Sequence, residues 1–206
     1  MDIVLRNETE SDYFIDENLT RETFWNVYKP GCDEHLLVHT MRGLPCCIKE
    51  LDIVAEVGGR IVGSIFYTKS KLTEPNGKEH ACASFGPISV HPDFQNQGIG
   101  SALIRHTLPI AEQMGYRAVF ITGNLAYYSR FGFQPASDFG IHLKSVPVED
   151  KAEFFMLKAL KTDALKGLSG VFEFDACYEV DQIRLGTFDK QFPPKVKEKR
   201  PGQIFS

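Results

Sequence analysis

The 206-residue sequence lacks the patterns that mark secreted, membrane-spanning and zinc-binding proteins. Its five cysteines are odd in number and show no Cys-x-x-Cys spacing, so they predict reduced thiols rather than a disulfide framework or a metal site. The first residues have no basic start followed by an apolar stretch, and no segment approaches the roughly 18 apolar residues of a membrane helix. We therefore expect a cytoplasmic protein without a metal ion or a membrane partner.

An excess of positive charge is also missing. The formal net charge is −4, which argues against a nucleic-acid partner held by a basic surface. The charge is unevenly spread, because five basic residues face one acidic residue between positions 190 and 206. The local charge there is +4, so residues 1–189 carry about −8.

Material for a hydrophobic core is plentiful, although there is only one tryptophan. Hydrophobic residues make up 43% of the chain and charged residues 24%, and there are 16 phenylalanines and 7 tyrosines. This composition excludes wholesale disorder. The length suits one substantial domain and is short for two.

Hydrophobic periodicity predicts one mixed α/β domain, with hairpins early and a strand–helix–strand unit at its centre. Gly58-Gly59 supplies a tight turn between two strands. Gly86-Pro87 interrupts a later strand, which we expect to lie at an edge or to be bulged or splayed there, and Pro109 is expected to kink the central helix. The predicted helices cover residues 11–28, 34–42, 98–114 and 125–130, and the predicted strands cover residues 3–6, 51–57, 61–67, 81–90, 118–122, 153–157 and 171–174.

The most informative stretch joins the end of a strand to the start of the central helix. It reads Val90-His91-Pro92-Asp93-Phe94-Gln95-Asn96-Gln97-Gly98-Ile99-Gly100-Ser101. Its two glycines allow a tight turn and leave no Cβ to block a ligand. The N–H groups from Gln97 to Ser101 would converge at a helix N-terminus, where donors and dipole together stabilise a diphosphate. The alternative is that the glycines serve only helix packing.

Two nucleotide-binding patterns are not matched by this loop. A dinucleotide fold expects a third glycine at position 103, which is Leu103, and an acidic residue about 20 positions after the loop. The stretch 120–124 has no carboxylate. A P-loop requires Gly-Lys-Ser/Thr, which does not occur. Nucleotide-redox and ATP-dependent functions are therefore disfavoured.

Three motifs follow one another around the loop. Val90-His91-Pro92 comes first, Gln95-x-x-Gly98-x-Gly100 second, and Tyr128-Ser129-Arg130-Phe131-Gly132-Phe133 third. In this order and at this separation they resemble the GNAT superfamily of acetyl-CoA-dependent N-acyltransferases, whose signature is Gln/Arg-x-x-Gly-x-Gly/Ala. The resemblance spans about residues 3–157 and is strongest over residues 85–134. The sequence is most similar to bacterial predicted N-acetyltransferases that carry an extended C-terminal segment.

The resemblance implies a single GNAT-like α/β domain. Its central sheet would be mixed and mostly antiparallel, with a splayed, bulged strand, and helices would flank it. We expect this domain over residues 1–160. A C-terminal extension over residues 161–206 would pack on it, with a basic, loosely ordered tail from about residue 190. Dimers are common in the family, so the resemblance is compatible with a homodimer.

The resemblance also implies acetyl-CoA as co-substrate, and a primary amine on a small molecule or a peptide as acceptor. The strand ending at Val90 would diverge from the strand over 118–122. Backbone groups of Ile88, Ser89 and Val90 would then bond the pantetheine amides like an added strand, and one N–H would stabilise the thioester oxyanion. The pyrophosphate would bind mainly the backbone of Asn96, Gln97, Gly98, Ile99, Gly100 and Ser101, with the side chains of Gln95 and Gln97 secondary.

By the same resemblance, Tyr128 is the general acid. A phenol, with a reference pKa of about 10, can protonate the thiolate that amine attack expels. The alternative is that Tyr127 and Tyr128 are packing aromatics. The role of Asn124 stays open, because related proteins place a cofactor-binding asparagine further before the tyrosine.

No general base is identified from the sequence. The candidates are better explained as structural or solvated residues, and water-mediated deprotonation of the acceptor is expected instead. These candidates are Glu34, His35, Glu50 and His91, of which His91 reads as a turn residue.

The predicted function is therefore transfer of an acetyl group from acetyl-CoA to a primary amine through a ternary complex. A non-catalytic acyl-CoA sensor is the alternative, because some related proteins keep the loop without turnover. A nucleotide-dependent oxidoreductase is a third hypothesis. The acceptor's identity is open, although an acidic body would attract a cationic amine.

Overall fold

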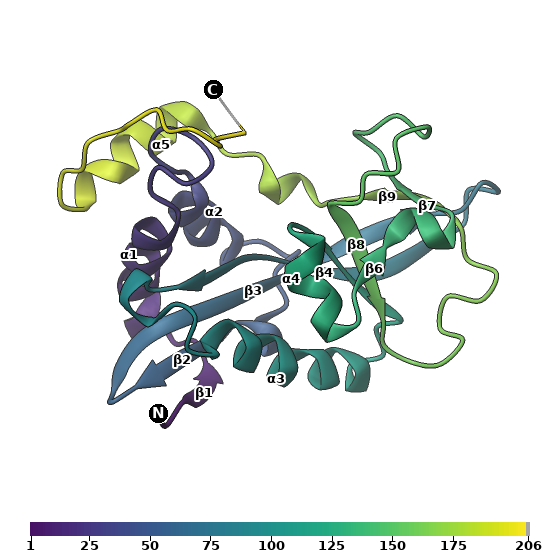
Figure 1. Cartoon of the computed structure of the whole chain (residues 1–206), viewed down its shortest axis with the longest axis horizontal. Coiled ribbons are helices and arrows are strands. Elements are labelled where there is room, and N and C mark those ends of the chain that lie inside the picture. The colour runs from purple at the N-terminus through teal and green to yellow at the C-terminus, as the bar shows by residue number, and fades with distance from the viewer. Residues whose placement is uncertain (205–206) are drawn as a thin grey trace. The chain divides into compact units, whose positions relative to one another are not determined.

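The computed structural model describes residues 1–204 and divides into two compact units. Unit 1 comprises Met1–Phe66, Pro87–Leu103 and the residues from Ala176 onward, and unit 2 comprises Tyr67–Gly86 and Ile104–Asp175. The chain passes between the units along two long strands, β3 (Arg60–Thr73) and β4 (Glu79–Val90), and along α3 (Ile99–Gln113) (Figure 1).

The sheet of unit 1 is antiparallel. Strand β1 (Val4–Asn7) pairs with β2 (Ile53–Val57), and β2 pairs with the first half of β3. Gly58 and Gly59, with φ of +58° and +76°, form the turn between β2 and β3, which confirms the predicted hairpin. The β3 strand is longer than predicted, because the continuously buried residues 61–68 are followed by alternating exposed and buried residues up to Thr73.

Three α-helices lie wholly within the described part of unit 1. α1 (Tyr13–Phe24) and α2 (Glu34–Met41) pack on each other, and α5 (Gln182–Phe188) lies in the yellow C-terminal segment of Figure 1. The sequence did not predict α5, because it is only seven residues long and buries only Leu185 and Phe188. Those two side chains pack with Leu36 of α2.

The stretch from residue 190, expected to be loosely ordered, is in contact with α1. Phe192 is buried and stacks on Phe14, with ring centroids 5.1 Å apart. The indole Nε1 of Trp25 donates to the carbonyl of Val196 at 2.9 Å, and Lys195 forms an ion pair with Glu22 at 2.7 Å. These contacts are tertiary, so the lysine-rich composition of the segment gave no sign of them.

The sheet of unit 2 mixes parallel and antiparallel pairs. β5 (Ala118–Thr122) pairs in parallel with β4 and antiparallel with β8 (Phe155–Ala159), which in turn pairs with β6 (Gln134–Pro135). The end of β3 pairs with β9 (Gly170–Glu173), beside which β7 (Ile141–Leu143) lies in parallel. The core stacks Phe120 on Phe172, with centroids 4.3 Å apart.

The predicted splay of β4 agrees with the pairing of its residues in unit 2. Within the described chain, the β4–β5 ladder consists of Ala83 opposite Val119 and Ser84 opposite Phe120. Gly86 follows with φ of +154°, a conformation that favours glycine. The ladder thus stops where the Gly86-Pro87 pair interrupts the strand.

The remaining elements are short, apart from α3. α4 (Leu125–Tyr128) follows β5, and α3 continues through Pro109 to Gln113. The 3-10 helices are η1 (Glu10–Asp12), η2 (Lys49–Leu51), η3 (Pro92–Phe94), η4 (Ser129–Phe131), η5 (Ala136–Phe139), η6 (Ala176–Tyr178) and η7 (Asp189–Gln191).

The chain therefore has the predicted fold class, a mixed, mostly antiparallel open sheet flanked by helices. Among the described residues, no helix is long and apolar enough to span a bilayer.

Candidate functional site

The glycine loop in unit 1 turns sharply into α3. Asn96 and Gly98 both take left-handed backbone conformations, with φ of +60° and +90°. The first helical bond of α3 runs from the N–H of Ala102 to the carbonyl of Gly98 at 2.9 Å. The N–H groups of Ile99, Gly100 and Ser101 therefore have no acceptor within residues 1–204, as expected at a helix N-terminus. Such amides suit an anion.

The glutamine side chains of the loop are bonded to the loop itself. The Nε2 of Gln95 donates to the carbonyl of Val90 at 3.2 Å, and the Nε2 of Gln97 donates to the carbonyl of Asp93 at 3.0 Å. These bonds hold both side chains against the backbone of the loop. The secondary role expected for both side chains in cofactor binding stays a prediction.

Gly63 on β3 allows α3 to begin close to the sheet. A Cβ at this position would lie 2.7 Å from Cγ2 of Ile99 and 3.3 Å from Cδ1 of Leu103. Since real Cβ atoms do not approach so closely, any larger residue would move the start of α3. Sequence reasoning missed Gly63, because its importance arises from a packing contact 36 residues away in the chain.

The end of β4 is held by α1 and β3, all within unit 1. The hydroxyls of Ser89 and Thr20 bond at 3.0 Å, and the hydroxyl of Thr23 donates to the carbonyl of Val90 at 3.1 Å. The N–H of His91 donates to the carbonyl of Val62 on β3. Because alternate residues of an antiparallel strand face the same neighbour, the backbone of Ser89 also faces β3, and that of Ile88 and Val90 faces the opposite edge.

His91 is a turn residue, as predicted. Its Nδ1 accepts the N–H of Asp93 at 3.3 Å and so caps η3. Its Nε2 lies 3.0 Å from the guanidinium of Arg60. Both ring nitrogens have structural partners, which disfavours His91 as a general base.

Tyr128 belongs to unit 2, where it ends α4. It is 8% exposed, and its ring packs edge-on against Phe85 and Phe133, with centroids 6.0 and 5.9 Å away. Tyr127 lies against it at 4.9 Å and is less buried. The ring orientation of Tyr128 is therefore fixed by aromatic packing on several sides.

The turn before α4 shapes the surroundings of Tyr128. The side-chain oxygen of Asn124 accepts the N–H of Ala126 at 2.9 Å, so Asn124 is the N-cap of α4. A Cβ at Gly123 would lie 2.6 Å from Cε2 of Tyr128, so only glycine leaves room for the ring in this position. The structure thus gives Asn124 a capping role, which the sequence had left open.

The other candidate bases are also in unit 1. His35 is fully buried between Cys32, whose Sγ lies 3.5 Å from its Nδ1, and Asp189, whose carboxylate is 3.3 Å from its Nε2. Burial lowers the pKa of His35 to about 4, so it is neutral at pH 7. Burial raises the pKa of Glu34, and Glu50 is exposed on η2. No candidate base gains support from these surroundings.

A buried charge cluster in unit 1 was not predicted. The guanidinium of Arg42 binds the carboxylates of Glu8 at 2.5 Å, Asp16 at 2.9 Å and Glu17 at 2.5 Å. Burial and the neighbouring Glu8 raise the pKa of Asp16 to about 8. One guanidinium does not neutralise three carboxylates, so the cluster favours retaining a proton. Its side chains are buried and tie α1 to α2.

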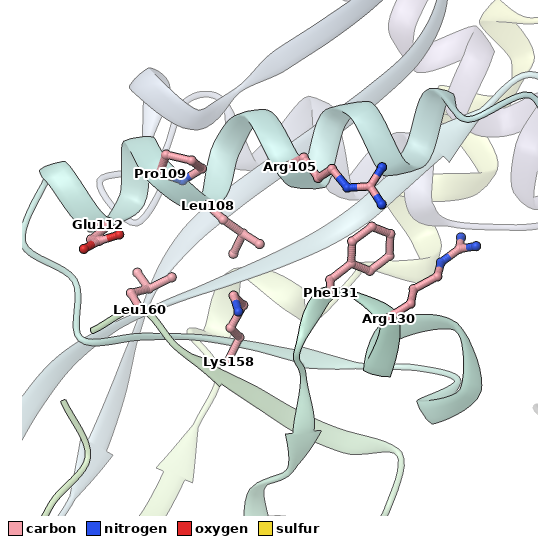
Figure 2. A pocket seen from close by; sticks show the side chains of 8 residues that line it. All are labelled: Arg105, Leu108, Pro109, Glu112, Arg130, Phe131, Lys158 and Leu160. Atoms are coloured by element: carbon pink, nitrogen blue, oxygen red, sulfur yellow. The ribbon is translucent and has the colours of Figure 1, made fainter. Parts of the chain in front are cut away.

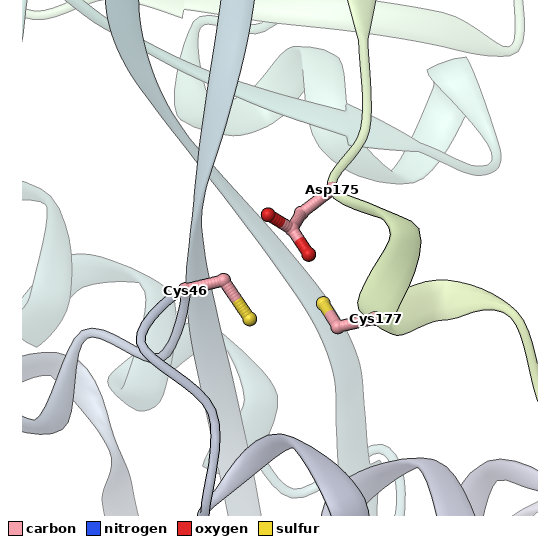
Figure 3. Close-up of side chains that lie close together, drawn as sticks. All are labelled: Cys46, Asp175 and Cys177. Carbon is pink, nitrogen blue, oxygen red and sulfur yellow. The ribbon is translucent and has the colours of Figure 1, made fainter.

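The five cysteines are free thiols, as predicted. Cys46 and Cys177, both buried in unit 1, direct their sulfur atoms toward each other, and these atoms lie within 4.8 Å (Figure 3). Figure 3 also draws Asp175, the last residue of unit 2. The two thiols pack with Leu37 and Met41, which is a hydrophobic environment for cysteine.

The sequence and the fold were compared with known proteins. Residues 10–133 match the model of the acetyltransferase (GNAT) family. The chain is 35% identical over 112 residues to the uncharacterized N-acetyltransferase YjhQ of Escherichia coli (strain K12), covering 52% of this chain and 59% of that protein. It is 27% identical over 116 residues to the uncharacterized N-acetyltransferase YhbS of the same strain, covering 56% and 66%. The matches thus span less than two thirds of either relative.

Two solved structures are similar over most of the chain. The E. coli GNAT family N-acetyltransferase YhbS in complex with CoA superimposes with a TM-score of 0.74 at 25% identity, covering 85% of this chain and 91% of that one. A GNAT family acetyltransferase from Brucella melitensis in complex with acetyl-CoA has a TM-score of 0.69 at 25% identity, covering 86% and 99%. The family match includes both the glycine loop and Tyr128. The chain belongs to the acetyltransferase (GNAT) family.

Proposed function

We propose that the protein transfers an acetyl group from acetyl-CoA to a primary amine by direct attack in a ternary complex. The observation that carries the proposal is the group of acceptor-free amides at Ile99, Gly100 and Ser101, presented after the left-handed Asn96 and Gly98. The solved relatives that bind CoA and acetyl-CoA support this choice of cofactor.

The cofactor's pyrophosphate would bind the glycine loop through backbone donors. Asn96 to Ser101 supply these donors at the N-terminus of a 15-residue helix, so the helix dipole adds to the hydrogen bonds. No lysine is needed, which explains how a body of about −8 can hold a polyanion. The pantetheine amides would pair with Ile88 and Val90, whose backbone faces away from β3, while Ser89 supports the strand through Thr20.

The reaction requires proton transfer at two atoms. The amine nitrogen attacks the thioester carbonyl carbon, and a backbone N–H from the end of β4 would stabilise the resulting oxyanion. When the C–S bond breaks, the sulfur leaves as a thiolate, to which the hydroxyl of Tyr128 would deliver a proton. The fixed, mostly buried ring of Tyr128 favours this role, because a positioned acid loses less entropy in the transition state.

Deprotonation of the acceptor would proceed through water. Both ring nitrogens of His91 have structural partners, His35 is fully buried, and Glu50 lies on the surface. A water chain leading to bulk solvent requires no such side chain.

The test is a CoA-release assay across primary amines with Tyr128→Phe. Loss of the general acid lowers kcat by about 100-fold or more, while the dissociation constant of acetyl-CoA changes by less than about twofold. Tyr127→Phe is the matched control, because Tyr127 is the adjacent, less buried tyrosine, and it should keep wild-type turnover. Wild-type turnover in Tyr128→Phe would refute the assignment. CoA binding without thiol release over a broad amine panel would instead identify an acyl-CoA sensor.

A further inference from the structure

Two thiols of unit 1 lie next to each other although they come from distant parts of the chain. Cys46 is in the turn between α2 and η2, and Cys177 is the middle residue of η6. Their sulfur atoms lie within 4.8 Å of each other, and Figure 3 shows the two side chains directed toward each other. Both are buried and pack in one cluster with Leu37 and Met41. The fold therefore brings together two sulfur atoms that the sequence separates.

The backbone around both thiols allows the sulfur atoms to approach further. A disulfide requires an S–S bond of about 2.05 Å. Rotation about χ1 moves the sulfur of a cysteine from one staggered position to another. Cys46 lies in a turn and Cys177 in a three-residue 3-10 helix, so a small backbone shift at either residue breaks no ladder of the sheet.

The other three thiols have different neighbours. The thiol of Cys47 donates to a carboxylate oxygen of Asp52 at 3.0 Å, and Sγ of Cys32 lies 3.5 Å from Nδ1 of His35. Cys82 belongs to unit 2, and it does not line the cavity of about 460 Å³ that Figure 2 shows in that unit. The fold thus selects one pair of thiols out of five.

A small cavity of unit 1 leads from the surface to Cys177. Its volume is about 70 Å³, and its lining includes the buried Leu36 and Cys177 together with the exposed Glu179 and Arg184. A water molecule occupies about 30 Å³ in the liquid, so the cavity has room for hydrogen peroxide and excludes a bulky oxidant. Cys46 is not in the lining. A small oxidant therefore reaches Cys177 before it reaches Cys46.

We propose that Cys46 and Cys177 form a reversible disulfide when the protein meets a hydroperoxide. The sulfur of Cys177 attacks one oxygen of hydrogen peroxide, the O–O bond breaks, and the leaving hydroxide takes up the thiol proton as water. Cys177 is now a sulfenic acid. The sulfur of Cys46 attacks the sulfur of Cys177, the S–O bond breaks, and the second hydroxide leaves as water with the proton of Cys46. Two thiols are thus oxidised by two electrons, and one peroxide is reduced to two waters.

The disulfide would tie η6, where the C-terminal part of unit 1 begins, to the turn after α2. The thiols of the structure are the reduced state, and a thiol reductant restores them by exchange. Disulfides that form in reducing compartments are mostly transient and serve redox sensing. The inference does not depend on the transferase activity, because the bond is detected without acetyl-CoA or an amine.

The experiment treats the full chain with hydrogen peroxide and follows the intact mass and the alkylation of the five thiols. The mass should fall by about 2 Da, because two hydrogens are lost. Peptide mapping should show Cys46 bonded to Cys177, and dithiothreitol should restore all five thiols. The disulfide closes a loop of roughly 130 residues, so the urea midpoint of the oxidised protein should be higher by roughly 1–2 M.

Cys47→Ala is the matched control, because Cys47 is the adjacent buried thiol, and it should form the disulfide at the wild-type rate. Cys46→Ala should leave a sulfenic acid at Cys177, which dimedone traps. Cys177→Ala should slow the oxidation of Cys46 by at least about tenfold, because Cys46 does not line the cavity.

The peptide map of the wild type decides the proposal even where a variant folds poorly. The proposal is overturned if peroxide produces no disulfide, or if Cys46 bonds to Cys47 or to a second chain. It is also overturned if Cys47→Ala abolishes the bond in a protein whose circular dichroism is unchanged.

Discussion

The contact between Arg21 and Asp189 allows a quantitative test of how the C-terminal segment is held. Arg21 on α1 is 1% exposed, and its Nε donates to the carboxylate of Asp189 at 2.7 Å. Its Nη1 donates to the carbonyl of Pro193 at 3.1 Å, and its guanidinium lies 4.2 Å from the ring of Trp25. The charge of Arg21 is thus compensated within unit 1 by a single carboxylate.

Asp189→Asn keeps the shape of the side chain and removes its charge. Removing one partner of a buried ion pair costs about 3–5 kcal/mol, because the other charge stays buried without compensation. The Asp189 side chain is 22% exposed, so water can reach it, and we expect about 3 kcal/mol. With a urea m-value of about 1–3 kcal/mol/M, the midpoint of unfolding should fall by roughly 1–3 M.

The matched control joins the same two segments at the surface. Lys195 and Glu22 form an ion pair at 2.7 Å, with side chains 27% and 33% exposed. Lys195→Met should therefore cost no more than about 1 kcal/mol. If the two variants lose the same free energy of unfolding within about 0.5 kcal/mol, the buried charge does not anchor the segment and the reasoning is wrong.

Three further predictions concern single residues. Gly123→Ala places a Cβ against the ring of Tyr128, so kcat should fall at least about tenfold while the affinity for acetyl-CoA is retained. Unchanged kinetics would contradict the role of Gly123 in positioning Tyr128. Gly63→Ala displaces Ile99 at the start of α3, so calorimetry should show CoA binding weakened by about tenfold. Equal affinity would refute the role of the glycine loop in CoA binding. Burial lowers the pKa of His35 to about 4, so the unfolded chain binds its proton between pH 4 and 6.5 and the native chain does not. As the pH rises from 4 to 6.5, the free energy of unfolding should increase by about 3 kcal/mol more in the wild type than in His35→Gln. Urea unfolding at each pH measures this. Equal dependence of the free energy of unfolding on pH in the two proteins would refute the prediction.

The local parts of the site were predictable from the sequence. The conformation of the glycine loop depends on residues within about ten positions of each other, so Gly98 and Gly100 predict the turn without knowledge of the fold. The same holds for the end of the β4–β5 ladder, because proline at position 87 lacks the N–H that a ladder requires. His91 was likewise identified as a turn residue, and it is the N-cap of η3.

Contacts between distant residues were not predictable. Gly63 reads as an ordinary strand residue, and only the approach of Ile99 explains it. Arg21 and Asp189 are separated by 168 positions, and neither has a sequence pattern that points to the other. Arg105, Arg130 and Lys158 line one cavity of unit 2 but come from a helix, a turn and a strand, so the sequence alone does not group them.

The composition of unit 1 has a consequence for biosynthesis. This unit is completed by the residues from Ala176 onward, which are synthesised after all of unit 2, because the residues of unit 2 end at Asp175. Arg21 on α1 and His35 on α2 therefore stay uncovered until Asp189 has been made. Synthesis proceeds at about 5–20 residues per second, so this interval lasts several seconds to half a minute. During it the nascent chain exposes apolar surface such as Leu36, which favours aggregation until the later residues cover it.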